Sequence, residues 1–292
     1  MELSIENVVK NLQDLPTLPT VVHRLRQALT DQKASAGDIA RIITCDVAIS
    51  TKILKMVNSS YYSLEKRVDS IQHAVAYLGF NNVYNLILNL SVLNIFSAKL
   101  SASVFKWRDF WHHCAATALT SKIVASQTGY KDVEAAFTAG LLHDLGKVIM
   151  GCSFQDAFAY IISVASEDKI SFIDAEKKLS KIDHSEIGAL AARFWNLPPL
   201  VQATIKHHHT MSTIDRVGLD ASKDQVVDIV IVANSIVQKM NIGLNGSFNE
   251  EPLLPEEPIK RLRITKEQMV AVKDQIEEQR SLMSGYLGFI GA

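Results

Sequence analysis

The sequence predicts an all-α fold of two packed helical lobes. Apolar residues recur at helical spacing along most of the chain, which places them on one side of each helix. One such face consists of Ile49, Ile53, Met56 and Val57. Residues 104–127 and 132–150 are rich in alanine and leucine, which favour helices. Alternating strand patterns are absent outside 226–232, where a β-branched run favours a strand by propensity.

The helices between these segments follow from similar patterns. Two further apolar faces precede residue 100, one of Ile71, Val75 and Leu78 and one of Val83, Leu86, Ile87, Leu90 and Leu93. Pro198 and Pro199 open a helix that runs toward His208, since proline suits the first turn of a helix.

The end of the chain combines a loop and a helix. Residues 241–263 contain two glycines, three prolines and four glutamates, which predicts a loop that crosses the surface. Thr265 and Gln268 form a capping box, so residues 266–281 should be the last helix.

We divide the chain into residues 1–100 as a first lobe, residues 101–240 as a second lobe, and residues 241–292 as a loop and C-terminal helix packed on the body. No linker composition occurs near 97–103, so the lobes are expected to pack together.

Composition narrows the class of protein. The net charge is −1 and no long basic run occurs, so we expect no direct nucleic-acid binding. Cys45, Cys114 and Cys152 are far apart in apolar helical contexts, as suits reduced thiols. The first residues carry no signal-peptide pattern, and no uncharged apolar stretch reaches ~18 residues. These features predict a cytoplasmic protein without a membrane partner.

Residues 137–147, Phe-Thr-Ala-Gly-Leu-Leu-His-Asp-Leu-Gly-Lys, are the most informative stretch. His143 and Asp144 are expected to be neighbours on one helix, ~100° apart around its axis, where both can converge on one cation. The apolar run before them places them at a wall of the core, and a buried Asp is costly unless it is paired or binds a metal. Lys147 lies one turn on, where its ammonium could meet a bound anion. A helical His–Asp pair held by hydrogen bonds is the alternative interpretation.

The other histidines extend this pattern. Seven of the nine lie between residues 112 and 209, in the order His113, His143-Asp144, His184 and His207-His208-His209 with His112 beside the first. This order resembles the HD superfamily of metal-dependent phosphohydrolases. It is similar to the HD-GYP branch in histidine spacing and to the HDOD (HD-related output domain) branch in the other motifs. Those motifs are Leu15–Pro19, Asp46–Leu54, Val57–Tyr62, Ile71, Ala74-Val75, Leu78-Gly79 and Ala139–Asp144.

The resemblance implies a metal site. Its implied ligands are His113, His143, Asp144, His184, His208 and His209, with His207 as a substitute for either neighbour. The implied catalytic residues are His143, Asp144 and Lys147. Imidazole and carboxylate ligands suit Fe, Mn, Zn, Ni or Co, and in the HD-GYP branch these positions hold two metals that clamp a phosphodiester. Asp183 and Glu186 flank His184 and are candidates to orient its ring. The resemblance also places a helix at 226–232, against propensity.

Two departures from the HD pattern bear on activity. The pattern ends with an Asp on a late helix, where this chain has Asn234, a neutral and poorer metal ligand. Asp228 is the nearest carboxylate, six residues earlier on another face of that helix. No Gly-Tyr-Pro follows the histidine run, so cyclic dinucleotide hydrolysis of the HD-GYP kind is not expected.

Two functions therefore remain open. The first is a bacterial signal-transduction regulator with a degenerate HD site, acting through a signalling partner protein or a small nucleotide ligand. The second is a metal-dependent phosphohydrolase acting on a nucleotide or phosphodiester, favoured by the complete set of histidines. The segment Asn58–Tyr62 is a recurring HDOD signature, and a helix-ending turn is its simplest interpretation.

Overall fold

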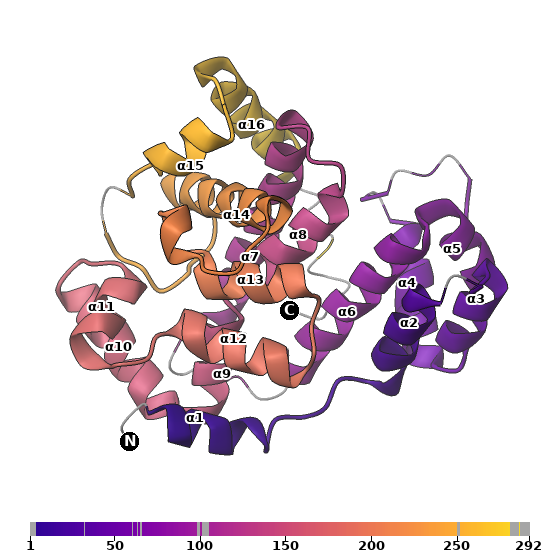
Figure 1. The fold of residues 1–292 in the computed structure, drawn as a ribbon, viewed down its shortest axis with the longest axis horizontal. Helices are drawn as coiled ribbons and strands as arrows, with labels where there is room; N and C mark the ends of the chain where they lie inside the picture. The colour runs from indigo at the N-terminus through magenta and orange to yellow at the C-terminus, as the bar shows by residue number, and fades with distance from the viewer. Residues whose placement is uncertain are drawn as a thin grey trace. The chain divides into compact units, whose positions relative to one another are not determined.

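The structure is a computed structural model that describes residues 4–31, 33–59, 61–62, 64, 66–97, 100, 105–249, 252–280 and 286. Every regular element among these residues is helical (Figure 1), which confirms the all-α prediction. No single helix of the described chain is long and apolar enough to cross a membrane; the bent pair Val133–Ser153 and Gln155–Glu167 passes that test by length and composition only.

The chain forms two compact units. One consists of Met1–Leu15 with Lys99–Arg280, and we call it the histidine unit; the other, the Pro16–Ala98 unit, also includes Ser281–Ala292. Residues 4–15 thus belong with the part of the chain that follows residue 98. The domain roles assigned to 1–100, 101–240 and 241–292 stay a prediction.

The Pro16–Ala98 unit is built from amphipathic helices. They are α2 (Thr20–Thr30), α3 (Ala36–Thr44), α4 (Val47–Val57), α5 (Ile71–Leu78) and α6 (Phe80–Ser97). Ser35 begins α3 with a capping box to Asp38, and Asp46 caps α4 by accepting from the Ile49 N–H at 3.0 Å. The face predicted on α4 is buried, with Ile53 fully excluded from solvent.

Asn58 explains one part of the Asn58–Tyr62 signature. It is the C-cap of α4. Its amide nitrogen donates to the carbonyls of Leu54 and Val68, and its oxygen accepts from the Val68 N–H, each at 2.8 Å. The side chain therefore ends the helix and closes the loop that follows, as the turn interpretation expects. Ser60 lies outside the described residues.

The histidine unit contains the remaining helices. They are α1 (Ile5–Leu12), α7 (Trp107–Gln127), α8 (Val133–Leu142), α9 (Leu145–Ser153), α10 (Gln155–Glu167), α11 (Phe172–Leu179), α12 (His184–Phe194), α13 (Pro199–His207), α14 (Ala221–Lys239), α15 (Glu256–Arg261) and α16 (Lys266–Glu278). Helix α7 packs against α8 and α14 at the centre of the unit. The residues of α14 from Val226 to Asn234 are all buried, and a helix that is apolar around its circumference belongs in a core. This burial explains why the β-branched run at 226–232 forms a helix.

The prediction for residues 241–263 is partly wrong. Residues Glu256–Arg261 form α15, whereas residues 241–249 form a loop in which Ile242, Asn245 and Gly246 are buried. The Leu244 N–H donates to the Asp109 carbonyl and the Phe248 N–H to the Ile170 carbonyl, both at 3.0 Å. Gly243 has φ +72, and a Cβ there would collide with the backbone of His113 and Asp109. The expected last helix does form, and Thr265 and Gln268 make its capping box.

Candidate metal centre

Four helix ends and one helix interior supply the candidate ligands. His113 lies within α7, His184 is the first residue of α12, and His208 and His209 follow α13. The single helix expected through His143 and Asp144 is wrong at this point. Helix α8 ends at Leu142 with His143 as its C-cap, and Asp144 is the N-cap of α9.

Gly146 permits the close approach of α9 to α12. A Cβ at this position would overlap the His184 carbonyl, and the next contact is the backbone N–H of Gly188. The glycine after Asp144-Leu145 therefore brings the start of α12, and with it His184, up to Asp144.

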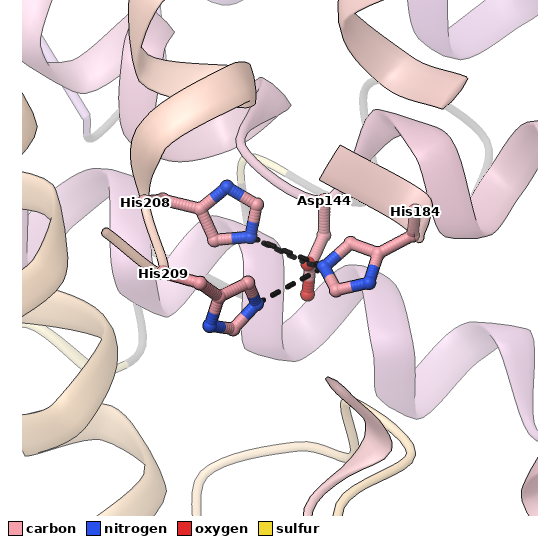
Figure 2. A group of neighbouring side chains, drawn as sticks. All are labelled: Asp144, His184, His208 and His209. Carbon is pink, nitrogen blue, oxygen red and sulfur yellow. Dashed lines mark hydrogen bonds and ion pairs between the residues drawn. The ribbon is translucent and has the colours of Figure 1, made fainter. Parts of the chain in front are cut away.

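Asp144 lies at the middle of the cluster (Figure 2). Its Oδ1 is 3.2 Å from His184 Nε2 and 3.4 Å from His208 Nε2, while its Oδ2 is 3.4 Å from His143 Nε2. His184 Nε2 is 3.1 Å from His209 Nε2. Two groups of potential ligands result, Asp144–His184–His208–His209 and His113–His143–Asp144, each with its ligand atoms within 4.8 Å of one another.

The ring orientations fit a cation. Carbonyl oxygens accept from Nδ1 of His143 at 2.7 Å and of His208 at 2.8 Å, so in each neutral ring Nε2 keeps a lone pair. The Nε2 atoms of His184 and His208 are 3.2 Å apart, and two lone pairs repel at that distance unless a proton or metal lies between them. The Oδ1 atom of Asp144 and Nε2 of His143 are buried without a hydrogen bond among the described residues. This donor set fits a divalent metal.

Glu176, on α11, orients His184. Its Oε2 is 2.6 Å from His184 Nδ1, and its Oε1 accepts from the His184 N–H at 2.8 Å. A buried carboxylate behind a ligating histidine is typical of metal sites. The two residues expected in this role, Asp183 and Glu186, instead form the capping box of α12. The sequence signal for Glu176 was its place on the apolar side of α11. Phe172 and Ala175, four residues and one residue before it, are both buried.

Burial and charge set the protonation of the rings. Burial lowers the pKa of His113 to about 3 and that of His208 to about 4, and it holds the pKa of His209 well below its usual range. Burial opposes the charged form of His184 too, but the carboxylates of Glu176 and Asp144 together outweigh it and raise the pKa to about 9. Without a metal, a proton on His184 therefore takes the position of the cation.

Lys147 neutralises one oxygen of Asp144. Its buried ammonium is 2.9 Å from Asp144 Oδ2 and 3.0 Å from the Asn245 carbonyl, and 4.9 Å from the centre of the Phe172 ring. Burial alone would raise the pKa of Asp144, but Lys147 and His143 hold it well below its usual range. The carboxylate is thus ionised with Oδ2 already paired, so Oδ1 is the oxygen left for a metal.

The remaining candidates lie outside the ligand groups. The side chain of Asn234 interacts with His113 and accepts from Gln238 Nε2 at 3.1 Å. His207 belongs to neither group, so His208 and His209 are the candidate ligands among the three consecutive histidines. All the ligand candidates are buried except His209, which is partly exposed.

Asp228 belongs to a separate buried cluster. It is 2.8 Å from Arg216 Nη2 and binds Arg261 through both carboxylate oxygens, at 2.7 and 2.8 Å. The same two arginines donate to the carbonyls of Thr210 and Met211. The cluster therefore holds the turn that follows His209.

Solved structures share this fold. An HDOD domain protein with unknown function from Geobacter sulfurreducens is 22% identical with a TM-score of 0.71, over 98% of this chain and 96% of that chain. A Marinobacter aquaeolei protein whose name assigns it provisionally to signal transduction is 20% identical with a TM-score of 0.77, over 100% of this chain and 62% of that chain. A Shewanella amazonensis protein, provisionally named a phosphohydrolase, is 21% identical with a TM-score of 0.68, over 98% and 97%. At these identities the likeness establishes the fold alone.

Curated proteins and a family model give the affiliation. A Treponema pallidum protein named only as uncharacterized is 28% identical over 206 residues, 70% of this chain and 39% of its own length. Ribonuclease Y of Mycoplasma mycoides is 28% identical over 179 residues, which are 59% of this chain and 33% of its own length. The chain thus spans less than half the length of these curated relatives. The HDOD domain model matches residues 15–211, more than half of the chain. This chain belongs to the HDOD domain family.

Proposed function

We propose that this chain is a signal-transduction regulator that binds one divalent metal ion through Asp144, His184, His208 and His209. The observation that carries the proposal is the convergence of Nε2 of His184, His208 and His209 with Asp144 Oδ1, an oxygen that makes no hydrogen bond among the described residues. Fe, Mn, Zn, Ni and Co all accept such ligands. When bound, the ion would supply a positive centre that can hold an anionic ligand.

One ion is favoured over two because of the charge balance. The second group consists of His113, His143 and Asp144, and its shared carboxylate is already paired through Oδ2 with Lys147. Asn234 adds no negative charge. A two-metal clamp on a phosphodiester needs both ions, so efficient hydrolysis by that mechanism is not expected.

The closed state of the centre also favours regulation. Asp144 is 1% exposed and His143 and His184 are 0% exposed, and residues 241–249 are tied to Asp109, Ile170 and Lys147 beside them. The family and the provisional signalling name of the Marinobacter neighbour point the same way. We expect this chain to act in the cytoplasm, where it would signal to a separate partner protein or respond to a small nucleotide ligand.

A metal-dependent phosphohydrolase is the second candidate. It is favoured by the number of histidines around one carboxylate, because a single ion can still polarise a phosphoryl oxygen. His143, Asp144 and Lys147 would then be its catalytic residues. The names of the Shewanella neighbour and of ribonuclease Y are consistent with this class.

Metal content of paired variants tests the proposal. We expect about one ion per chain by elemental analysis, lost in His209→Ala and retained in His113→Ala, because only His209 belongs to the four-residue group. Circular dichroism of both variants controls for folding. Two ions per chain, or loss of the ion from both variants, would contradict the one-ion centre. Metal-dependent hydrolysis of bis(p-nitrophenyl) phosphate that disappears in His143→Ala would instead favour the phosphohydrolase.

A further inference from the structure

We propose that a pocket in the Pro16–Ala98 unit binds a small phosphate ester through Lys55, Lys66 and Arg67. The pocket has a volume of about 810 Å³, and its described lining residues all come from one stretch of α4 and the loop after it. Pockets for small organic ligands measure about 300–1,000 Å³, so the size suits one whole small molecule. The candidate metal ligands all belong to the histidine unit, so this site goes beyond the proposed function and does not depend on it.

One wall of the pocket is a face of α4. Thr51, Leu54, Lys55 and Asn58 line the pocket, and their spacing of three and four residues places them on one side of a helix. The core of the unit takes a different face of α4, which includes Ile53. The pocket side of this helix therefore faces a cavity while its other side holds the unit together.

The second wall is the loop that follows α4, and Asn58 holds it in place. Its side chain donates to the Val68 carbonyl and accepts from the Val68 N–H, both at 2.8 Å. Leu64, Lys66, Arg67, Val68 and Asp69 line this wall. Because the loop is tied to the end of α4, the wall is preorganised, which lowers the entropic cost of binding a ligand.

The charges of the lining favour an anion. Lys55, Lys66 and Arg67 are exposed and make no hydrogen bond or ion pair among the described residues. Asp69 is the one carboxylate in the described lining. Over residues 51–69 the chain carries four lysines and arginines against two carboxylates, the other being Glu65, outside the described residues. The stretch is therefore net positive, and a phosphate ester carries about −1.5 to −2 charges at pH 7. The guanidinium fork of Arg67 also fits two phosphate oxygens at once.

Apolar side chains provide a surface for the carbon part of the ester. Leu54 and Leu64 are partly buried and Val68 is buried, and all three line the pocket. The Ser59 hydroxyl, also in the lining, already donates to the Met56 carbonyl at 2.6 Å. The pocket thus combines positive charge with apolar surface, which favours an ester with an apolar or aromatic body over free phosphate or a neutral sugar.

Arg67→Gln tests the site, and Arg24→Gln is its matched control. Both substitutions change an exposed arginine of the Pro16–Ala98 unit, and Arg24, on α2, lies outside the pocket. The probes are phenyl phosphate, inorganic phosphate, phenol and a hexaglutamate peptide, titrated calorimetrically into the full chain. Sodium chloride at about 0.15 M screens attraction between distant surface charges. A second series uses the chain after a chelator has removed any metal.

We expect phenyl phosphate to bind about tenfold more tightly than inorganic phosphate, because its ring covers the apolar lining. Phenol, which has no charge, should bind most weakly. Arg67→Gln should weaken phenyl phosphate binding about tenfold or more, the effect of one lost hydrogen bond between charged groups. Arg24→Gln should stay within about twofold of the wild type. Circular dichroism of both variants controls for folding, and metal removal should change none of these affinities.

No binding of phenyl phosphate at millimolar concentration, or equal losses in the two arginine variants, would overturn the inference and leave the three cations as ordinary solvated charges. Binding of the hexaglutamate peptide without phenyl phosphate would overturn it in favour of an acidic protein partner. Loss of phenyl phosphate binding on metal removal would place the anion at the metal centre, which contradicts this site but not the proposed function. A chain that takes up no metal yet binds phenyl phosphate as expected would refute the proposed function alone.

Discussion

The two compact units bury different chemistry. In the described part of the Pro16–Ala98 unit the buried polar residues are Asn89 and Ser91, and the rest of its core is apolar. The histidine unit buries many ionisable groups, namely His113, His143, Asp144, Lys147, Glu176, His184, His207, His208, Arg216 and Asp228. Both units are helical, so helix formation does not require this difference. Burying a charged group costs free energy unless the group is paired. In the histidine unit many of these buried groups are the proposed metal ligands and the residues that contact them.

The largest effect should come from breaking the buried ion cluster. Asp228→Ala leaves Arg216, which is 2% exposed, with only the longer contact to Asp224 at 3.5 Å, and it also removes a bidentate partner of Arg261. We expect the free energy of unfolding to fall by about 3–5 kcal/mol in urea titrations. Glu257→Ala removes an exposed partner of the same Arg261 and should cost about 0–1 kcal/mol. Equal effects of the two substitutions would mean that burial does not matter here.

A core substitution in the other unit should affect stability alone. Ile53 is 0% exposed on α4, so Ile53→Ala should lower the free energy of unfolding by about 2–5 kcal/mol through the cavity it leaves. The folded variant should keep its full metal content by elemental analysis. Metal loss at a temperature where circular dichroism shows a folded chain would erase the contrast between the units.

Glu176 and Glu186 compare a buried and a capping carboxylate near the same ligand. Glu176→Gln weakens the acceptor behind His184 Nδ1, and we expect metal affinity to fall about 10–100-fold in chelator competition. Glu186→Gln alters only the capping box and should leave the affinity within about twofold. If Glu186→Gln lowered metal affinity more than Glu176→Gln, Glu186 would be the residue that orients His184, as its position beside His184 in the sequence predicts.

The smallest effect should come from the surface of the Pro16–Ala98 unit. Hydrogen bonds from Ser35 lower the pKa of Asp38 to about 2 from a usual value of 3.8. Because the folded-state pKa is depressed, the carboxylate stabilises the unit above about pH 4 and this contribution is lost as pH falls toward 2. The difference in thermal midpoint between wild type and Asp38→Asn should therefore shrink from pH 7 to pH 2.5. A difference that grows on acidification would contradict the sign.

The sequence was a good guide wherever local spacing decides structure. The faces of α4 and α5, the proline start of α13 and the capping box of α16 each depend on residues within a few positions of one another. The helix at 226–232 needed the family resemblance, because burial overrides β propensity there. The histidines and Asp144 were found by their order along the chain.

Contacts between distant segments escaped prediction. Glu176 meets His184 across a helix–helix junction, and Asn245 reaches Lys147 from 98 positions away. The break between His143 and Asp144 has no glycine or proline to mark it. Periodicity reports which side of a helix is apolar, and it carries no information on which distant backbone will fill the space beside it.

Gly146 has a consequence for the choice of metal. The contact between its backbone and the His184 carbonyl limits how near α9 and α12 lie, and this separation fixes the span between Asp144 and His184. Ions differ in radius and in the bond lengths they accept. A residue that touches no metal would therefore set the distance between two of the proposed ligands, and Gly146→Ala, whose Cβ would overlap the His184 carbonyl, would force His184 away from Asp144.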